Sequence, residues 1–243
     1  MPPLTLPHGD DGERFAEVVV VRHGETSWNA SRIVQGHMDP ELNEIGRQQA
    51  VVVARCLSTE TKPAAVYSSD LKRAAETAQT IAKACGVSNL VLNEGLRERH
   101  MGNLQGVNWE DAFVQNPGAF KGFDVFEPKK DLDFDYRDQE IPGGGESLNQ
   151  LSERFLSCLN KIAQQHIGER VIVVSHGAAI VELCKHTDPP GSSVRRKIPN
   201  TSLSVFHFTG VTGQWDLVSV GDAGHLGANG ALESAFGGDG ASA

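Results

Sequence analysis

The sequence predicts an α/β fold: a three-layer αβα sandwich around a mostly parallel central sheet, in a single domain that carries an inserted cap segment. Two segments, residues 18–21 and 171–174, consist only of valine and isoleucine. Such runs are apolar on both faces and are typical of central strands buried in a parallel sheet. Strand patterns alternate with amphipathic helical patterns along the chain, which is the arrangement found in α/β proteins.

The first half of the chain predicts strands and helices in alternation. Ser69 and Asp70 have the side chains of a helix N-cap, and Gly86 has the residue type that ends a helix. The expected elements are a strand over 17–22, a loop over 26–42, a helix over 44–57, a strand over 64–67, a helix from 69 to about 85 and a strand over 90–92.

The second half adds an irregular segment and then returns to strands and helices. The last two strands alternate apolar and polar residues and are joined by the glycine-containing turn at 210–213, so they predict an antiparallel edge. The expected elements are a short helix over 109–113, a long amphipathic helix over 147–165, a strand over 171–175, a helix over 178–186 and strands over 203–208 and 215–220.

These elements define one domain with two tails. Residues 1–14 are rich in Pro, Gly and Asp and are expected to form a flexible tail, and residues 227–243 are rich in Gly, Ala and Ser and are expected to be disordered. The domain covers 15–226. Within it, about 100–146 is the inserted cap, and long irregular insertions of this kind commonly determine specificity.

Composition narrows the class of partner. The 243 residues carry 22 Lys and Arg against 31 Asp and Glu, a net charge of −9, which argues against general binding to nucleic acid or to an anionic membrane. A small anionic substrate remains compatible with this charge. The four cysteines form no CxxC pair and are expected to be free thiols. With no signal-like segment at the amino end, we expect a cytoplasmic protein.

Both buried strands end in the same residue types. Arg22 and His23 follow the first, and His176 and Gly177 follow the second. A single charged strand end would be interpreted as reaching solvent. Two strands of the same design favour one common site, because ligands of open α/β sheets bind at the carboxyl ends of the strands.

Two further charged residues stand at the ends of elements. Arg73 lies near the start of a helix, and Glu98 follows the strand over 90–92. Two arginines, two histidines and one carboxylate suit a phosphoryl group: arginine binds its oxygens, histidine can act as nucleophile and a carboxyl group can protonate the leaving oxygen. We find no metal-ligand spacing and no GxxxxGKS loop, so we predict a reaction without metal or cofactor.

The residues that carry this chemistry lie in motifs that resemble those of the histidine phosphatase superfamily, in its phosphoglycerate mutase-like branch. The resemblance covers nearly everything from about 18 to 226. Its motifs are Arg22-His23-Gly24-Glu25-Thr26-Ser27-Trp28-Asn29, Gln35-Gly36, Leu42-Asn43-Glu44-Ile45-Gly46, Tyr67-Ser68-Ser69-Asp70-Leu71-Lys72-Arg73-Ala74, the segment Glu98 to Gly106, Pro142-Gly143-Gly144-Gly145-Glu146-Ser147 and Ser175-His176-Gly177.

The resemblance implies a role for each motif residue. His23 would attack phosphorus and become phosphohistidine, and Glu98 would protonate the leaving alcohol and then activate water. Another branch of the superfamily carries its acid directly after the second histidine, where this chain has Gly177, and this favours Glu98. The residues expected to bind the substrate are Arg22, Thr26, Asn29, Gln35, Gly36, Arg73, His176 and Gly177.

Structural interpretations compete at two of these positions. Arg73 could be a surface arginine of its helix, and Glu98 could form an ion pair with Arg97 or Arg99. The other histidines, His37 and His100 among them, are interpreted as ordinary polar or half-buried residues.

Three functions are compatible with the motifs: a phosphatase for a small phosphorylated metabolite, a cofactor-dependent phosphoglycerate mutase and a catalytically silent scaffold. The resemblance implies an arginine pair after the acid in mutases, and Lys121-Gly122 stands there instead, followed by acidic residues. This favours the phosphatase and a substrate with a neutral or cationic group near the phosphate.

A homodimer is compatible with the sequence.

Overall fold

The computed structural model describes residues 14–120, 137–188 and 197–227. Its six-stranded sheet has the order β3-β2-β4-β1-β5-β6. The first four strands in this order run parallel, β5 is antiparallel to β1, and β6 is antiparallel to β5, which confirms the predicted sheet. The strands are β1 Phe15–Arg22, β2 Ala65–Ser68, β3 Leu90–Leu92, β4 Arg170–Ser175, β5 Leu203–Thr209 and β6 Gln214–Asp222.

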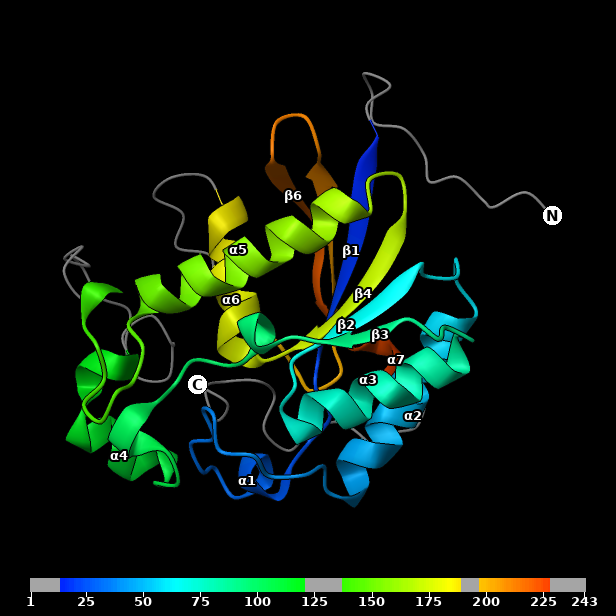
Figure 1. Cartoon of the computed structure of the whole chain (residues 1–243). Helices are drawn as coiled ribbons and strands as arrows, with labels where there is room; N and C mark the ends of the chain where they lie inside the picture. Colours follow the sequence, from blue (N-terminus) through cyan, green and yellow to red (C-terminus); the bar gives the residue numbers. More distant parts are fainter. Residues whose placement is uncertain (1–13, 121–136, 189–196, 228–243) are drawn as a thin grey trace.

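The two valine-rich strands, β1 and β4, are neighbours in the middle of this sheet, and their side chains build two separate cores. Val18 and Val20 belong to the core under the long helix α5, Leu148–Gln165, and under α6, Gly177–Thr187. Val19 and Val21 belong to the core on the other face, under α2, Glu44–Ser58, and α3, Lys72–Ala84. The helices therefore cover both faces, as the three-layer prediction requires (Figure 1).

The predicted N-cap of α3 is wrong. Leu71 occupies the N-cap position without a side-chain hydrogen bond. Asp70 instead forms an ion pair with Arg97, and the first amide of the helix, that of Lys72, donates to Asp39 Oδ1 at 2.7 Å. A carboxylate does meet the start of this helix, but it comes from a loop more than thirty residues earlier in the chain.

The inserted segment forms a small separate core together with Val34. It contains the short helix α4, Trp109–Gln115, and the 3₁₀ helices η2, Gly102–Leu104, and η3, Pro117–Phe120. The buried members of this core are Val34, Met101, Leu104, Trp109, Ala112, Ala119 and Ile141. Lys121, Gly122 and the acidic residues that follow lie outside the described residues, so the expectation about them stays a prediction.

Short elements account for the other differences from the predictions. The helix α1, Ser27–Ala30, lies in the segment predicted to be a loop, the 3₁₀ helix η1 covers Glu94–Leu96, and α7, Gly224–Gly227, follows the last strand. The tails lie outside the described residues, except that Arg14 precedes β1 and Gly227 ends α7. Elements of three or four residues are too short to show a helical period in the sequence.

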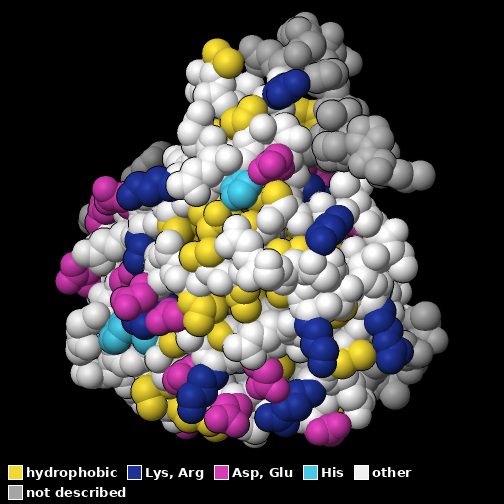
Figure 2. Space-filling view, turned by 45° about the vertical axis from the view of Figure 1, so that its right-hand side comes forward, with side chains coloured by type: hydrophobic (Ala, Val, Ile, Leu, Met, Phe, Trp, Pro, Cys, Tyr) yellow, Lys and Arg dark blue, Asp and Glu magenta, His cyan; other side chains and the backbone are white. Residues whose placement is uncertain are grey.

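The surface over β3, α2 and α3 mixes both signs of charge. Figure 2 shows basic and acidic side chains next to one another there, with apolar side chains between them. Arg47 pairs with Glu76, and Lys72 lies 3.4 Å from Glu41. Exposed pairs of this kind contribute little to stability.

Candidate active site

The two strand ends meet, as predicted. The amide of His23 donates to the carbonyl of Ser175 at 3.0 Å, and the centroids of the His23 and His176 rings are 5.1 Å apart. Arg22, His23 and His176 are at most 1% exposed, so the interpretation as strand ends reaching solvent is wrong. The parallel pairing of β1 with β4 brings together residues that are 153 positions apart in the chain.

The hydrogen bond of the His23 ring decides which nitrogen can react. Nδ1 lies 2.7 Å from the carbonyl oxygen of Gly24. A carbonyl can only accept, so Nδ1 carries the hydrogen and Nε2 keeps its lone pair. Nε2 is buried and has no hydrogen-bond partner among the described residues. The ring is therefore held in the tautomer that a nucleophilic nitrogen needs.

The backbone around His23 is fixed from several sides. A Cβ added to Gly24 would lie 2.5 Å from the carbonyl oxygen of Gly46, so the two backbone segments approach each other closely here. Asn200 Nδ2 donates to the carbonyl of His23 at 2.9 Å, and the amide of Thr201 donates to that of Arg22 at 3.0 Å. Thr201 has a φ of 55°, which is strained for a β-branched residue. The sequence did not predict these contacts of Asn200 and Thr201, because no sequence pattern marks a threonine with a strained backbone conformation.

Arg73 is buried, so its interpretation as a surface residue is wrong. Its Nη1 and Nη2 donate to the carbonyls of Met38 and Gly36 at 2.8 and 2.9 Å, while Nε is buried without a partner among the described residues. Arg22 Nη1 donates to the carbonyl of Ile198 at 2.6 Å. Carbonyl acceptors, which carry no net charge, thus hold guanidinium nitrogens of both arginines inside the protein.

Thr26 orients two amide side chains. Its hydroxyl lies 3.0 Å from Asn29 Oδ1 and 2.9 Å from Gln35 Oε1, and its amide donates to Asn29 Oδ1 at 3.0 Å. Both amide oxygens are therefore occupied by Thr26. The NH₂ groups of Asn29 and Gln35 are buried and lack partners among the described residues. This leaves two hydrogen-bond donors available to a ligand.

The two predicted glycines lie in different places: one in the loop after α1 and one at the start of α6. Gly36 has a φ of 51°, and a Cβ there would collide with the side chain of Gln105. Gly177 is the first residue of α6, for which His176 is the N-cap.

Glu98 is fully buried and lies against the start of α6. Its Oε1 accepts from the amides of Arg99 and Ala179 at 2.8 and 3.3 Å, and its Oε2 accepts from the amide of Ala178 at 3.1 Å. The competing ion pairs are not what holds it: the Arg97 guanidinium binds Asp70, and that of Arg99 donates to the carbonyls of Glu146 and Ala119.

Burial and the arginines set the protonation states of the site. Burial, with the charges of Arg73 and Arg22, holds the pKa of His23 well below its ordinary value, and burial with Arg73 does the same to the pKa of His176. Burial lowers the pKa of Arg73 to about 10 and raises the pKa of Glu98. At neutral pH both histidines are thus neutral, both arginines are charged, and Glu98 is closer to its acid form than an exposed glutamate.

These histidines should make stability fall with acidification. The unfolded chain takes up their protons near the ordinary pKa of 6.5, whereas the folded protein does so only well below it, so their contribution is complete above pH 6.5 and is lost as pH falls. Each contributes up to about 1.4 kcal/mol of unfolding free energy per pH unit. The raised pKa of Glu98 acts in the opposite direction, but it is one carboxyl group against these two histidines, and burial lowers the pKa of His37 in the same direction as theirs.

Urea unfolding between pH 7.5 and 5 measures this effect. His176→Asn should flatten the dependence, whereas His186→Asn, at an exposed position, should keep the wild-type slope. Equal slopes in all three proteins would contradict the assigned protonation states.

The structure also assigns contacts to residues whose roles the sequence did not predict. His37 Nε2 lies 2.7 Å from the carbonyl oxygen of Glu98, and the His37 ring meets that of His100 edge-on. Burial lowers the pKa of His37 to about 4. Arg154, on α5, contacts the same carbonyl of Glu98 at 3.0 Å. One feature of the sequence could have indicated Arg154. It lies at helical spacing between Leu151 and Cys158, so a charged residue interrupts the apolar face of the predicted helix.

Further findings concern metals, membranes and thiols. Within the described residues, no group of three or more His, Cys, Asp or Glu side chains is arranged to hold a metal ion. No helix in the described ranges is long and apolar enough to span a membrane. None of the four cysteines forms a disulfide; Cys158 and Cys184 are buried, and Cys56 and Cys85 are half-buried.

Known proteins resemble this chain over nearly its whole length. The sequence model of the histidine phosphatase superfamily (branch 1) matches residues 18–223. Phosphoglycerate mutase-like protein 4 of Arabidopsis thaliana is 48% identical over 226 residues, 93% of each protein. The metal-independent phosphoserine phosphatase of Arabidopsis thaliana is 43% identical over 223 residues, 92% of this chain and 88% of that protein.

A solved structure shares the fold. It is a histidine-to-alanine mutant of the Entamoeba histolytica phosphoserine phosphatase in complex with phosphoserine, with a TM-score of 0.66 and 27% identity. The match covers 87% of this chain and 99% of that chain.

Proposed function

The chain belongs to the histidine phosphatase superfamily, and on that premise we propose that it is a metal-independent phosphatase that hydrolyses a small phosphomonoester through a phosphohistidine intermediate. One observation carries the proposal: the site gathers buried nitrogen atoms that lack partners within the described part of the chain. They are His23 Nε2, both ring nitrogens of His176, Arg73 Nε, Asn29 Nδ2 and Gln35 Nε2. Buried polar atoms are nearly always satisfied, so this group fits an anion with several oxygens.

The first step transfers the phosphoryl group to the protein. The lone pair of His23 Nε2 attacks phosphorus while the bond from phosphorus to the ester oxygen breaks. Arg22, Arg73 and His176, with the amides of Asn29 and Gln35, stabilise the charge on the three non-bridging oxygens. Because the Gly24 carbonyl holds Nδ1–H, the positive charge that develops on the ring has an acceptor beside it.

Glu98 serves both steps. As an acid it gives its proton to the leaving alkoxide, and as a base it then takes a proton from the water that attacks the phosphohistidine, which releases phosphate and restores both residues. Oε2 accepts only one amide and Oε1 accepts two, so we assign the proton to Oε2. The raised pKa of Glu98 supports the acid role.

We propose an amino-alcohol phosphate such as phosphoserine as the substrate class. The support is the similarity to a metal-independent phosphoserine phosphatase and the acidic character of the insertion sequence, which favours a substrate ammonium group. A matched pair tests this point, because phosphoserine and 3-phosphoglycerate differ only by an ammonium group in place of a hydroxyl. We expect kcat/KM to favour phosphoserine, and a clear preference for 3-phosphoglycerate would contradict this substrate class.

Phosphorus NMR tests the reaction itself. The purified protein is incubated with a chelator, first with phosphoserine and then with 3-phosphoglycerate plus catalytic 2,3-bisphosphoglycerate. We expect free phosphate and no 2-phosphoglycerate. Rapid isomerisation with little free phosphate would instead make the protein a mutase, the function that the similarity to phosphoglycerate mutase-like protein 4 keeps as the second candidate. No turnover of any phosphomonoester would support the scaffold.

A further inference from the structure

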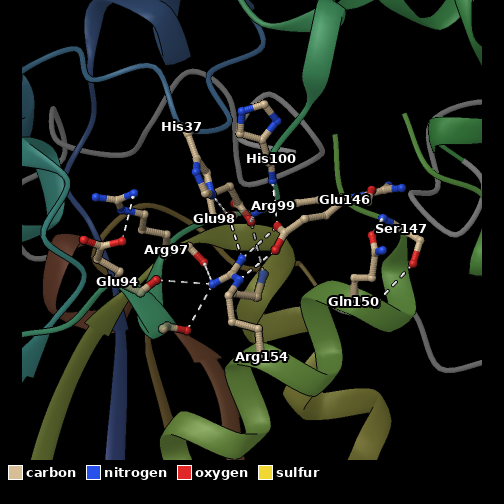
Figure 3. A network of polar contacts seen from close by, with 12 residues as sticks. His37, Glu94, Arg97, Glu98, Arg99, His100, Glu146, Ser147, Gln150 and Arg154 are labelled. Carbon is tan, nitrogen blue, oxygen red and sulfur yellow. Dashed lines mark hydrogen bonds and ion pairs between the residues drawn. The ribbon is translucent and has the colours of Figure 1, made fainter. Parts of the chain in front are cut away.

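A network of hydrogen bonds and ion pairs surrounds the main chain of Glu98, and its centre is Arg154 (Figure 3). Arg154 lies on α5, and its side chain is 24% exposed. Arg154 Nε and Nη2 bind Glu146 Oε1 and Oε2 at 2.7 and 2.8 Å, a bidentate pair. Glu146 directly precedes Ser147, the N-cap of α5, so this carboxylate is anchored to the start of the same helix.

The rest of the Arg154 guanidinium holds the main chain that carries Glu98. Nη1 donates to the carbonyls of Gly95 and Arg97, both at 3.0 Å, and Nη2 donates to that of Glu98 at 3.0 Å. With the two bonds to Glu146, all five N–H groups of the guanidinium have acceptors. Arg154 therefore has no donor left for a phosphate oxygen, in contrast to Arg73, whose Nε is unpartnered within the described residues.

Glu146 connects this clamp to the base of the insertion. Its Oε2 accepts from the amide of His100 at 2.8 Å, and its own amide donates to the carbonyl of His100 at 2.8 Å. The Nε of Arg99 donates to the carbonyl of Glu146 at 2.8 Å. The two ends of the insertion, residues 100 and 146, thus meet at the residue that holds Arg154.

Glu98 is consequently fixed at two levels. Its main-chain carbonyl accepts hydrogen bonds from Arg154 and His37. Its carboxylate accepts hydrogen bonds from the amides of Arg99 and of Ala178, in α6. Only the planar arginine fork reaches three carbonyls and a carboxylate together, since a lysine ammonium has three donors on one atom. A proton transfer needs its acid within hydrogen-bond reach of the leaving oxygen, and small displacements lower the rate.

We propose that Arg154, held by Glu146, is a positioning residue that sets Glu98 for proton transfer and couples the base of the 100–146 insertion to this step. The inference rests on the proposed function, in which Glu98 is the acid. A residue that acts only through the acid should matter where the leaving group needs a proton and hardly at all where it does not.

The test compares two substrates on the same protein sample. Arg154→Gln, Arg154→Lys and the control Arg170→Gln are assayed for kcat/KM with p-nitrophenyl phosphate and with the alkyl phosphate that the wild-type protein hydrolyses fastest. Arg170 pairs with Glu17 and Glu60 at the opposite end of β4, so it matches Arg154 as a half-buried paired arginine. The ratio of the two kcat/KM values does not depend on the fraction of active protein.

We expect Arg154→Gln to lower kcat/KM on the alkyl phosphate by roughly 10- to 100-fold and on the aryl phosphate by less than about threefold. Arg154→Lys should lie between Arg154→Gln and wild type, and it decides the test if the glutamine variant does not fold. Arg170→Gln should leave the ratio unchanged. Added to Glu98→Gln, Arg154→Gln should cost less than about another twofold on the alkyl phosphate, because the acid is already absent.

The outcomes separate the two proposals. Equal losses on both substrates in the Arg154 variants, or losses that add to those of Glu98→Gln, would overturn the positioning role while the acid stands. If Glu98→Gln itself shows no dependence on the leaving group, the acid assignment fails and the role of Arg154 fails with it.

Discussion

His23→Asn is expected to lower phosphate release by roughly 10⁴-fold or more, as the loss of a nucleophile does in covalent catalysis. Asparagine places an amide N–H where the histidine has Nδ1–H, so the bond to the Gly24 carbonyl can persist. It has nothing in place of Nε2, the nitrogen whose lone pair is free. The variant should therefore keep its fold, lose its turnover and form no phosphoenzyme.

Two further measurements sharpen this result. Rapid acid-free quenching of the wild-type protein with substrate, followed by mass spectrometry, should locate the phosphoryl group on His23. Phosphorus NMR of the phosphoenzyme should assign it to Nε2, because Nδ1 is occupied. His166→Asn is the control: this half-buried histidine binds Tyr67 and Glu169 before the start of β4, away from the site, and should keep wild-type turnover. Retained activity in His23→Asn would refute the nucleophile.

Glu98→Gln has the second largest expected effect, a loss of roughly 10²- to 10⁴-fold in kcat/KM for alkyl phosphates. Aryl phosphates should lose far less, because a phenolate leaves without being protonated. Hydrolysis of the phosphoenzyme should slow for every substrate, since glutamine cannot take a proton from water. The side-chain NH₂ would face the amide of Ala178 or those of Arg99 and Ala179, so we also expect a stability loss of about 1–3 kcal/mol.

Glu182→Gln is the matched control for Glu98→Gln. Glu182 is a carboxylate on α6 that is 2% exposed, but it pairs with Arg137 and Lys185. Its replacement should cost stability without changing the ratio of alkyl to aryl activity. If Glu98→Gln slowed both substrate classes equally in the first step, Glu98 would only organise the start of α6.

The sequence alone determined the order of the elements and the residues at the strand ends. The valine and isoleucine runs of β1 and β4 predicted central strands, because such runs are typical of strands that are covered on both faces. Their carboxyl ends had to share one edge of the sheet, and this brings Arg22, His23 and His176 together. Arg73 and Glu98 stood out because they lie at the ends of elements, and the motif resemblance then implied their roles.

Only the tertiary structure decided how these groups are held. The carboxylate that meets the first amide of α3 is Asp39 and not Asp70, and Glu98 meets the start of α6, about eighty residues further along the chain. Arg154 binds main-chain carbonyls, and every residue has one, so no residue type marks its partners in advance. Patterns of side chains predict which faces are buried, whereas contacts with the backbone exist only after distant segments have packed.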